Sequence, residues 1–274
     1  MNLRTLIRRI IYFIMPRRAY KFALREFVPP GDLDGLAEVL ASTRHLRSVQ
    51  PVAMDRPAGR RVLVIAPHED DEMIGPGGSI IRLVRDGADV KVLYLADDVS
   101  AHGADRRRET LAIGAHVGYE TEFLGCRSGS LAVDQDTADR LARSIDAYAP
   151  DTLMLPFLSD DHPEHRAASR LLHLAATRGR IGSRPEVWAY QVYSALLANV
   201  VVDITDVAND KAEAIRMWRD SAMRSRDWAH YALGLNAFNC RLLQGRSDPL
   251  YAEAFFVVPF DDYIALCGRY EHAN

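Results

Sequence analysis

The sequence predicts an α/β fold of Rossmann-like type: a mostly parallel sheet flanked by helices, with extra strands and helices towards the C-terminus. Three observations predict it. Between residues 61 and 177, short apolar runs alternate with segments of helical spacing, the pattern of parallel strands joined by helical crossovers. Polar groups follow two of these runs, at residues 68–72 and 160–165, where open α/β sheets bind ligands. A chain of 274 residues with 48% apolar content can also bury one large core.

The individual elements follow from the period of the apolar residues. Continuous β-branched and aliphatic runs predict buried strands, and apolar residues three or four positions apart predict helices. We expect strands at 62–66, 90–96, 121–124, 152–156, 187–193, 200–204 and 254–258. We expect helices at 78–85, 105–117, 136–148, 164–177, 207–226 and 228–243. Charged residues of the 207–226 helix, Lys211 among them, have exposed spacing and predict a solvated face.

Charge and cysteine content narrow the class of protein. The 34 Lys and Arg residues nearly balance the 37 Asp and Glu residues, so no nucleic-acid partner is expected. Cys126, Cys240 and Cys267 show no paired spacing, which argues against disulfides or a thiolate metal site and favours a reducing, cytoplasmic location. No apolar stretch reaches the ~20 residues that a membrane-spanning helix needs.

The N-terminal segment differs from the rest. We expect residues 1–57 to form a basic amphipathic helix and a linker, ahead of the main domain at 58–274. In residues 1–27, apolar residues recur at helical spacing with basic residues between them, and Pro16 is expected to break the helix. Two interpretations stay open: peripheral contact with the inner face of a membrane, or packing on the domain or a second subunit. The sequence does not predict the oligomeric state.

The first polar motif reads A-P-H-E-D-D-E and follows the apolar run 62–65. His68 and Asp71 are spaced so that an imidazole at a strand end and a carboxylate on the next turn can converge on one divalent cation. Alone, the motif is weak, because acidic turns after strands often only cap a helix.

The second motif, H-P-E-H at 162–165, follows the expected strand 152–156. Two strand ends of one sheet would then supply two histidines and a carboxylate, with a position left open for water. That set suits a hydrolytic Zn²⁺ ion. General chemistry alone favours zinc, since such ligands also accept Fe²⁺, Mn²⁺ or Co²⁺.

These two segments, 67–72 and 162–165, resemble the two signatures of the PIG-L/LmbE-like deacetylases, metal-dependent enzymes that remove N-acetyl groups from amino sugars. The similarity extends over residues 61–259, through Gly77-Gly78, Arg106-x-x-Glu109, Val202-Asp203-Ile204 and Tyr251-Ala252-Glu253-Ala254-Phe255. The resemblance implies particular roles: His68, Asp71 and His165 as metal ligands, Asp70 as general base, His162 as the group that stabilises the oxyanion, Glu164 as its orienting partner, and Arg106 as a substrate contact.

Three positions depart from the family pattern. Glu69 stands where the family usually has Pro, Glu164 where it usually has Asp, and Ser128 where many relatives have Asp. The first adds a charge beside a ligand. The second lengthens a carboxylate side chain by one methylene group, and the third removes a carboxylate.

The resemblance implies a metal-dependent hydrolase that removes an N-acetyl group from an amino sugar, in glycan, glycolipid or secondary-metabolite biosynthesis. Two alternatives belong to other classes. A two-His-one-carboxylate iron(II) oxygenase shares the ligand types, but the parallel-strand pattern disfavours it. A non-catalytic scaffold is disfavoured because Asp70 is present along with every expected ligand.

Overall fold

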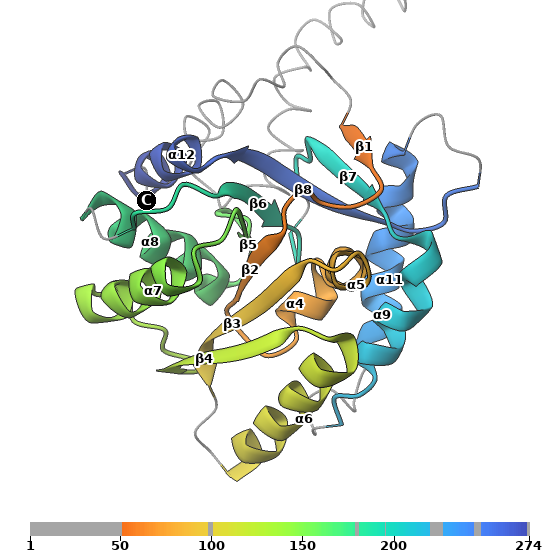
Figure 1. Ribbon diagram of the computed structural model, residues 1–274, viewed down its shortest axis with the longest axis horizontal. Coiled ribbons are helices and arrows are strands. Elements are labelled where there is room, and N and C mark those ends of the chain that lie inside the picture. The colour runs from red at the N-terminus through yellow and green to blue at the C-terminus, as the bar shows by residue number, and fades with distance from the viewer. Residues whose placement is uncertain are drawn as a thin grey trace, which may run out of the picture.

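The structure is a computed structural model, and it describes residues 51–97, 101–178, 181–194, 196–219, 227–243 and 248–272. The helix expected at 1–27 lies outside these residues. The described part is organised around an eight-stranded sheet with the order β1-β7-β8-β6-β5-β2-β3-β4, and helices cover both of its faces (Figure 1).

The strands are parallel except for β8, which runs antiparallel to both of its neighbours. The strands span Val52–Met54 (β1), Arg61–Ala66 (β2), Asp89–Asp97 (β3), Glu120–Arg127 (β4), Thr152–Pro156 (β5), Glu186–Tyr190 (β6), Val200–Asp203 (β7) and Ala252–Pro259 (β8). The predicted α/β fold with a mostly parallel sheet is therefore confirmed. β1, which the sequence analysis assigned to a linker, pairs with β7 at the sheet edge.

Successive side chains of a strand point to opposite faces of the sheet, and β2 shows this directly. Val62 and Val64 pack in one core cluster, whereas Leu63 and Ile65 pack in the other. All four are fully buried, which explains the uninterrupted apolar run. A central parallel strand covered on both faces cannot alternate with polar residues.

The helices form the two outer layers. α7 (Gln135–Tyr148), α8 (Pro163–Thr177) and α12 (Phe260–His272) contribute to one core cluster. The other cluster contains residues of α4 (Asp71–Ile74), α5 (Gly77–Arg85), α6 (Ala101–Val117), α9 (Ala208–Ile215) and α11 (Trp228–Asn239). Single 3₁₀ turns lie at Thr205–Val207 and Cys240–Leu242. No helix among the described residues combines the length and the apolar character needed to cross a bilayer.

The C-terminal half departs most from the expected elements. The helix expected at 207–226 ends at Ile215, and residues 220–226 lie outside the described part. Trp218, only 4% exposed, instead turns towards α6, where its indole Nε1 donates to Thr110 Oγ1 over 3.4 Å. The short α4 and the C-terminal α12 were not expected at all.

Lys211 also contradicts the solvated face predicted for its helix, because it is completely buried. Its Nζ donates to the carbonyl oxygens of Ile74 and Gly75, each over 3.0 Å, and to Glu253 Oε1 over 2.7 Å. Asn236 Oδ1 accepts a further bond of 3.0 Å. Lys211 therefore fastens the C-terminal end of α4 to elements that come much later in the chain.

Candidate metal centre

The two polar motifs meet at the carboxyl ends of neighbouring strands. β2 and β5 pair in parallel, with Val62 opposite Thr152 and Val64 opposite Met154. From β2 the chain moves to β3 and β4 on one side, and it then returns to β5 on the other. Such a switch in strand order leaves a crevice outside the strand ends, which is where open α/β sheets bind ligands.

Asp71 lies at the centre of the cluster. One carboxylate oxygen, Oδ2, is 3.2 Å from His68 Nδ1 and 3.1 Å from His165 Nε2. The same oxygen accepts the backbone N–H of His68 over 2.9 Å. Asp71 and His165 are fully buried, while the His68 side chain is 18% exposed. Two ring nitrogens from different strand ends thus converge on one buried carboxylate.

The second nitrogen of each ring faces another carboxylate. His68 Nε2 is 2.6 Å from Glu164 Oε2, and His165 Nδ1 is 2.9 Å from Asp160 Oδ1. Histidines that hold a metal characteristically direct their other nitrogen to a carboxylate or carbonyl group, which fixes the ring and its tautomer. His68 has this hydrogen bond, and His165 has the carboxylate at the same close distance but without hydrogen-bond angles.

The outer carboxylates are themselves held by backbone groups. Glu164 accepts N–H bonds from Leu131 over 2.7 Å and from Gly129 over 3.3 Å. Asp160 accepts from His162 over 3.0 Å and from Tyr193 over 3.2 Å. These backbone bonds fix the two carboxylates independently of the His68 and His165 rings, so both rings are oriented by a rigid frame.

The buried polar atoms of the cluster are incompletely satisfied. Among the described residues, Asp71 Oδ1 has no hydrogen-bond partner, and neither ring nitrogen of His165 has a contact with hydrogen-bond angles. Such unsatisfied buried groups are rare in native proteins and point to an ion or water at the site. Two imidazoles and a carboxylate are the ligands that Zn²⁺ and related divalent ions accept, so the residues fit a metal.

Ionisation follows from the same contacts. Burial lowers the pKa of His68, but the hydrogen bond and charge of Asp71 outweigh it and raise the pKa to about 9. For His165, burial is outweighed in the same way by Asp71 and Asp160, and the pKa is raised to about 10. Burial raises the pKa of Asp71, yet the two rings hold it well below its usual range. Without a cation, protons on the two rings balance the carboxylate charge.

His162 stands beside this set and has a different local role. It is the N-cap of α8, and its Nδ1 accepts the backbone N–H of Glu164 over 3.3 Å, with Pro163 in the first helical turn. The single proton of the neutral ring therefore lies on Nε2. Burial, followed by the charges of His165 and His68, lowers the pKa of His162, which favours this neutral form.

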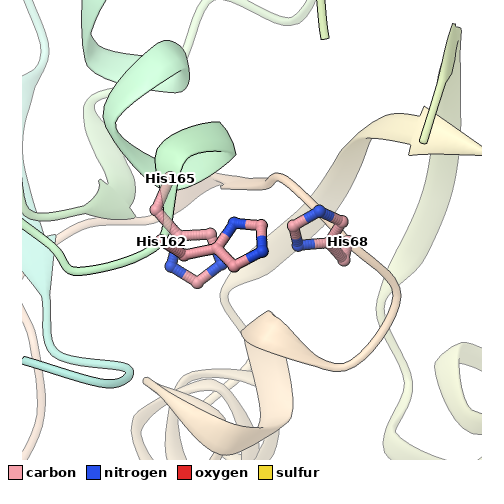
Figure 2. Close-up of side chains that lie close together, drawn as sticks. All are labelled: His68, His162 and His165. Atoms are coloured by element: carbon pink, nitrogen blue, oxygen red, sulfur yellow. The ribbon is translucent and has the colours of Figure 1, made fainter. Parts of the chain in front are cut away.

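The three imidazole rings gather at one place (Figure 2). The ring centroid of His162 is 4.8 Å from that of His68 and 4.8 Å from that of His165. One ligand atom from each of the three lies within 4.8 Å of the others. By distance alone, His162 is therefore a third imidazole that a metal could reach.

Asp70 lies next to the cluster on a constrained backbone. Its φ is 152°, a conformation that is uncommon outside glycine and concentrated at functional sites. The Asp70 backbone N–H donates to Glu72 Oε2 over 3.2 Å, and Glu72 Oε1 accepts from the Tyr119 hydroxyl over 2.9 Å. Burial, and then the neighbouring charge of Asp71, raises the pKa of Asp70 to about 7.

Arg106, expected to contact substrate, is bound within the protein. Its Nη2 is 3.0 Å from Asp70 Oδ2, and its Nε donates to Glu69 Oε2 over 3.3 Å. The carboxylate that departs from the family pattern therefore anchors this arginine. The Arg106 charge lowers the pKa of Asp70 against the effect of burial.

The structure thus brings together His68, Asp70, Asp71, His162, Glu164 and His165. It differs from the sequence analysis on Glu164, whose carboxylate contacts His68 rather than His162. The contact of Asp160 with His165 was missed. Its position two residues before His162, at a strand end, was the only signal in the sequence.

Fold and site together define the class of protein: an α/β protein with a cluster of histidines and carboxylates that could hold a metal, at the switch point of its sheet. Residues 63–176, which contain both motifs, match the model of the PIG-L family of GlcNAc-PI de-N-acetylases. The resemblance predicted from the motifs is confirmed.

Several individual proteins are similar to this chain. A diacetylchitobiose deacetylase of Thermococcus kodakarensis is 26% identical over 185 residues, which cover 57% of this chain and 68% of that protein. The solved N,N'-diacetylchitobiose deacetylase of Pyrococcus horikoshii has a TM-score of 0.61 at 24% identity, over 75% of this chain and 86% of that one. GalB, a 4-carboxy-2-hydroxymuconate hydratase of Pseudomonas putida, has a TM-score of 0.58 at 21% identity, over 75% and 96%. At these identities the structural likeness shows the fold alone, and one fold can carry different chemistry.

Proposed function

We propose that this protein is a metal-dependent hydrolase that removes the N-acetyl group of an amino sugar. One observation carries the proposal: Asp71 Oδ2 lies between His68 Nδ1 and His165 Nε2, beyond the carboxyl ends of β2 and β5, with Asp70 beside it. The matched family and the curated relative are deacetylases of sugar substrates by name. The iron oxygenase alternative has no comparable support.

We assign the metal to His68, Asp71 and His165. His162 is within reach, but ligation through Nε2 would place its proton on Nδ1, where it would face the N–H of Glu164. The cap of α8 would then be lost. Zn²⁺ is the proposed ion, and Fe²⁺, Mn²⁺ and Co²⁺ fit the same donors. When bound, such an ion polarises a carbonyl group and lowers the pKa of water from 15.7 to about 7.

The protein's own groups would then handle the protons and the substrate charge. Asp70, with a pKa raised to about 7, is suited to accept a proton from the attacking water near neutral pH. The Nε2–H of His162 is suited to stabilise the oxyanion that develops on the acetamide. Glu164 and Asp160 hold the rings of His68 and His165 in place. Arg106 holds Asp70, and its contact with the substrate stays a prediction.

The test is release of acetate, and of the free amine, from N-acetylglucosamine and N,N'-diacetylchitobiose. We expect activity that is lost after treatment with a chelator and restored by Zn²⁺, with oxygen making no difference. Asp70→Asn should bind the metal normally and have no measurable turnover. Activity that persists without metal, or that requires oxygen, would rule the proposal out.

A further inference from the structure

A row of aromatic side chains leads from the metal centre to the surface. The Tyr193 ring stacks on that of His165, with centroids 5.3 Å apart and planes 13° apart. Trp228 lies 6.4 Å from Tyr193, and Tyr231 lies 6.0 Å from Trp228. Tyr193 is 45% exposed and Tyr231 is 55% exposed. Aromatic surface is thus continuous from a candidate metal ligand outwards.

The row is built on a rigid frame. The backbone N–H of Tyr193 donates to Asp160 Oδ2 over 3.2 Å, and Asp160 Oδ1 faces His165. Asp227 caps α11 by accepting the N–H of His230 over 3.1 Å, which places Trp228 and Tyr231 one helical turn apart on one face. The far end of α11 is joined to the segment before Tyr193, because Asn239 Nδ2 donates to Gln191 Oε1 over 2.9 Å.

The chemistry of the row suits a sugar ring. Large exposed aromatic groups beside a catalytic crevice mark ligand surfaces, and the face of a pyranose that carries axial C–H groups packs well on an aromatic ring. Among the described residues, the hydroxyls of Tyr193 and Tyr231 make no hydrogen bonds, so they are available to sugar hydroxyls. A hydrocarbon chain would leave both hydroxyls unsatisfied.

We propose that Tyr193, Trp228 and Tyr231 form a subsite for the sugar ring next to the one that loses its acetyl group. The substrate would then be an oligosaccharide or a glycoconjugate rather than a single amino sugar. This inference rests on the proposed function. It adds the size of the substrate and the residues that recognise its second ring.

The test compares N-acetylglucosamine with its β1,4-linked dimer and trimer. We expect wild-type kcat/KM to be higher for the dimer, and Tyr231→Ala to reduce the ratio of dimer to monomer by roughly tenfold, the size of one aromatic stacking contact. Tyr231→Trp should keep the ratio. Phe238→Ala is the matched control, because Phe238 is 59% exposed on the same helix and packs on Arg241 instead.

Binding is measured separately in Asp70→Asn, so that turnover is not needed. Calorimetry should show tighter binding of the dimer than of the monomer, and Tyr231→Ala should remove the difference. If the dimer binds in this way but nothing is deacetylated, the subsite stands and the proposed function fails. If monomer and dimer bind or react alike, or if Phe238→Ala matches Tyr231→Ala, the subsite is wrong while deacetylation stands. Tyr231-dependent binding of alkyl-chain detergent micelles without binding of the dimer would also overturn it.

Discussion

Two buried clusters of charge lie at the two ends of α4, and they differ in how far their polar atoms are satisfied. At the C-terminal end, Lys211 Nζ has four oxygen partners. Glu253 accepts from Lys211 and from the backbone N–H groups of Gly78 and Ser79. At the N-terminal end, Asp71 and His165 carry buried atoms without aligned partners. We infer that the first, which we call the complete cluster, is structural, whereas the second, which we call the open cluster, is arranged for a cation.

The difference has a physical cause. A buried charge is costly unless it is paired and hydrogen-bonded, and the Lys211 cluster meets that requirement with protein groups alone. Burial lowers the pKa of Lys211, while Glu253 opposes the shift. Asp71 and His165 are equally buried, but their cluster meets the requirement only with added protons or a metal. The two clusters should therefore respond oppositely to metal and to mutation.

The largest expected effect is a loss of protein stability when the complete cluster is broken. Lys211→Met should lower the free energy of unfolding by about 3–5 kcal/mol, because it leaves Glu253 as an unpaired buried charge. Urea denaturation measures this. Glu213→Gln, an exposed change on the same helix, should stay within ~0.5 kcal/mol of wild type. Adding Glu253→Gln to Lys211→Met should recover part of the loss, and equal stability of all these variants would contradict a structural role.

The next effect distinguishes the proposed metal ligands of the open cluster from the neighbouring His162. His162→Asn keeps an N-cap acceptor for α8 but removes the Nε2–H that we assign to the oxyanion. We expect full metal occupancy and a lower kcat, equivalent to a loss of about 3 kcal/mol of transition-state stabilisation. His165→Ala should lose both metal and activity. Metal analysis together with acetate release decides between the two ligand sets, since loss of metal from His162→Asn would favour the three-histidine site.

Most members of the open cluster could be predicted from the sequence, because they follow predictable strand ends. β5 spans residues 152–156 as expected, and parallel strands bring their carboxyl ends to one edge of the sheet. The family resemblance implied that Glu164 orients His162. The cap at the start of α8 instead uses the Glu164 backbone, and the carboxylate extends to His68. The resemblance therefore did not predict the contact of Glu164 with His68.

The complete cluster could not be predicted from local patterns. Lys211 has the spacing of an exposed residue, and its burial depends on Glu253 in β8 and Asn236 in α11. Such partners are known only after the antiparallel β8 is placed between β6 and β7. α12 is a different case. Its buried residues, Phe260, Tyr263, Leu266, Cys267 and Tyr270, have helical spacing, a signal that our prediction did not use.

Metal addition should also distinguish the two clusters, through a smaller change in the free energy of unfolding. At free Zn²⁺ 100-fold above its Kd, the wild-type protein should gain about 2.7 kcal/mol of stability, measured as a rise in unfolding temperature. Asp71→Asn should gain nothing, and Lys211→Met should show the full gain from its lower starting point. Asp160→Asn should bind metal 10–100-fold more weakly, in the range typical of outer carboxylates. An equal gain in wild type and Asp71→Asn would place the metal elsewhere.

The smallest effect is the pH dependence of metal binding, and it follows from the protons that fill the open cluster. In the metal-free protein the pKa of His68 is raised to about 9 and that of His165 to about 10, from 6.5. Folded-state values above the unfolded value contribute stability that is fully present below pH 6.5 and is lost as pH rises through about 9 to 10.

A cation must displace one proton from each ring. Between pH 6.5 and about 9, binding should therefore release up to two protons, and the apparent affinity should rise about tenfold per pH unit for each proton released, or about 1.4 kcal/mol. Calorimetric titration with Zn²⁺ in buffers of different ionisation enthalpy counts these protons. If no proton is released, the two rings are already neutral in the metal-free protein. The open cluster would then not be filled by protons that a metal displaces.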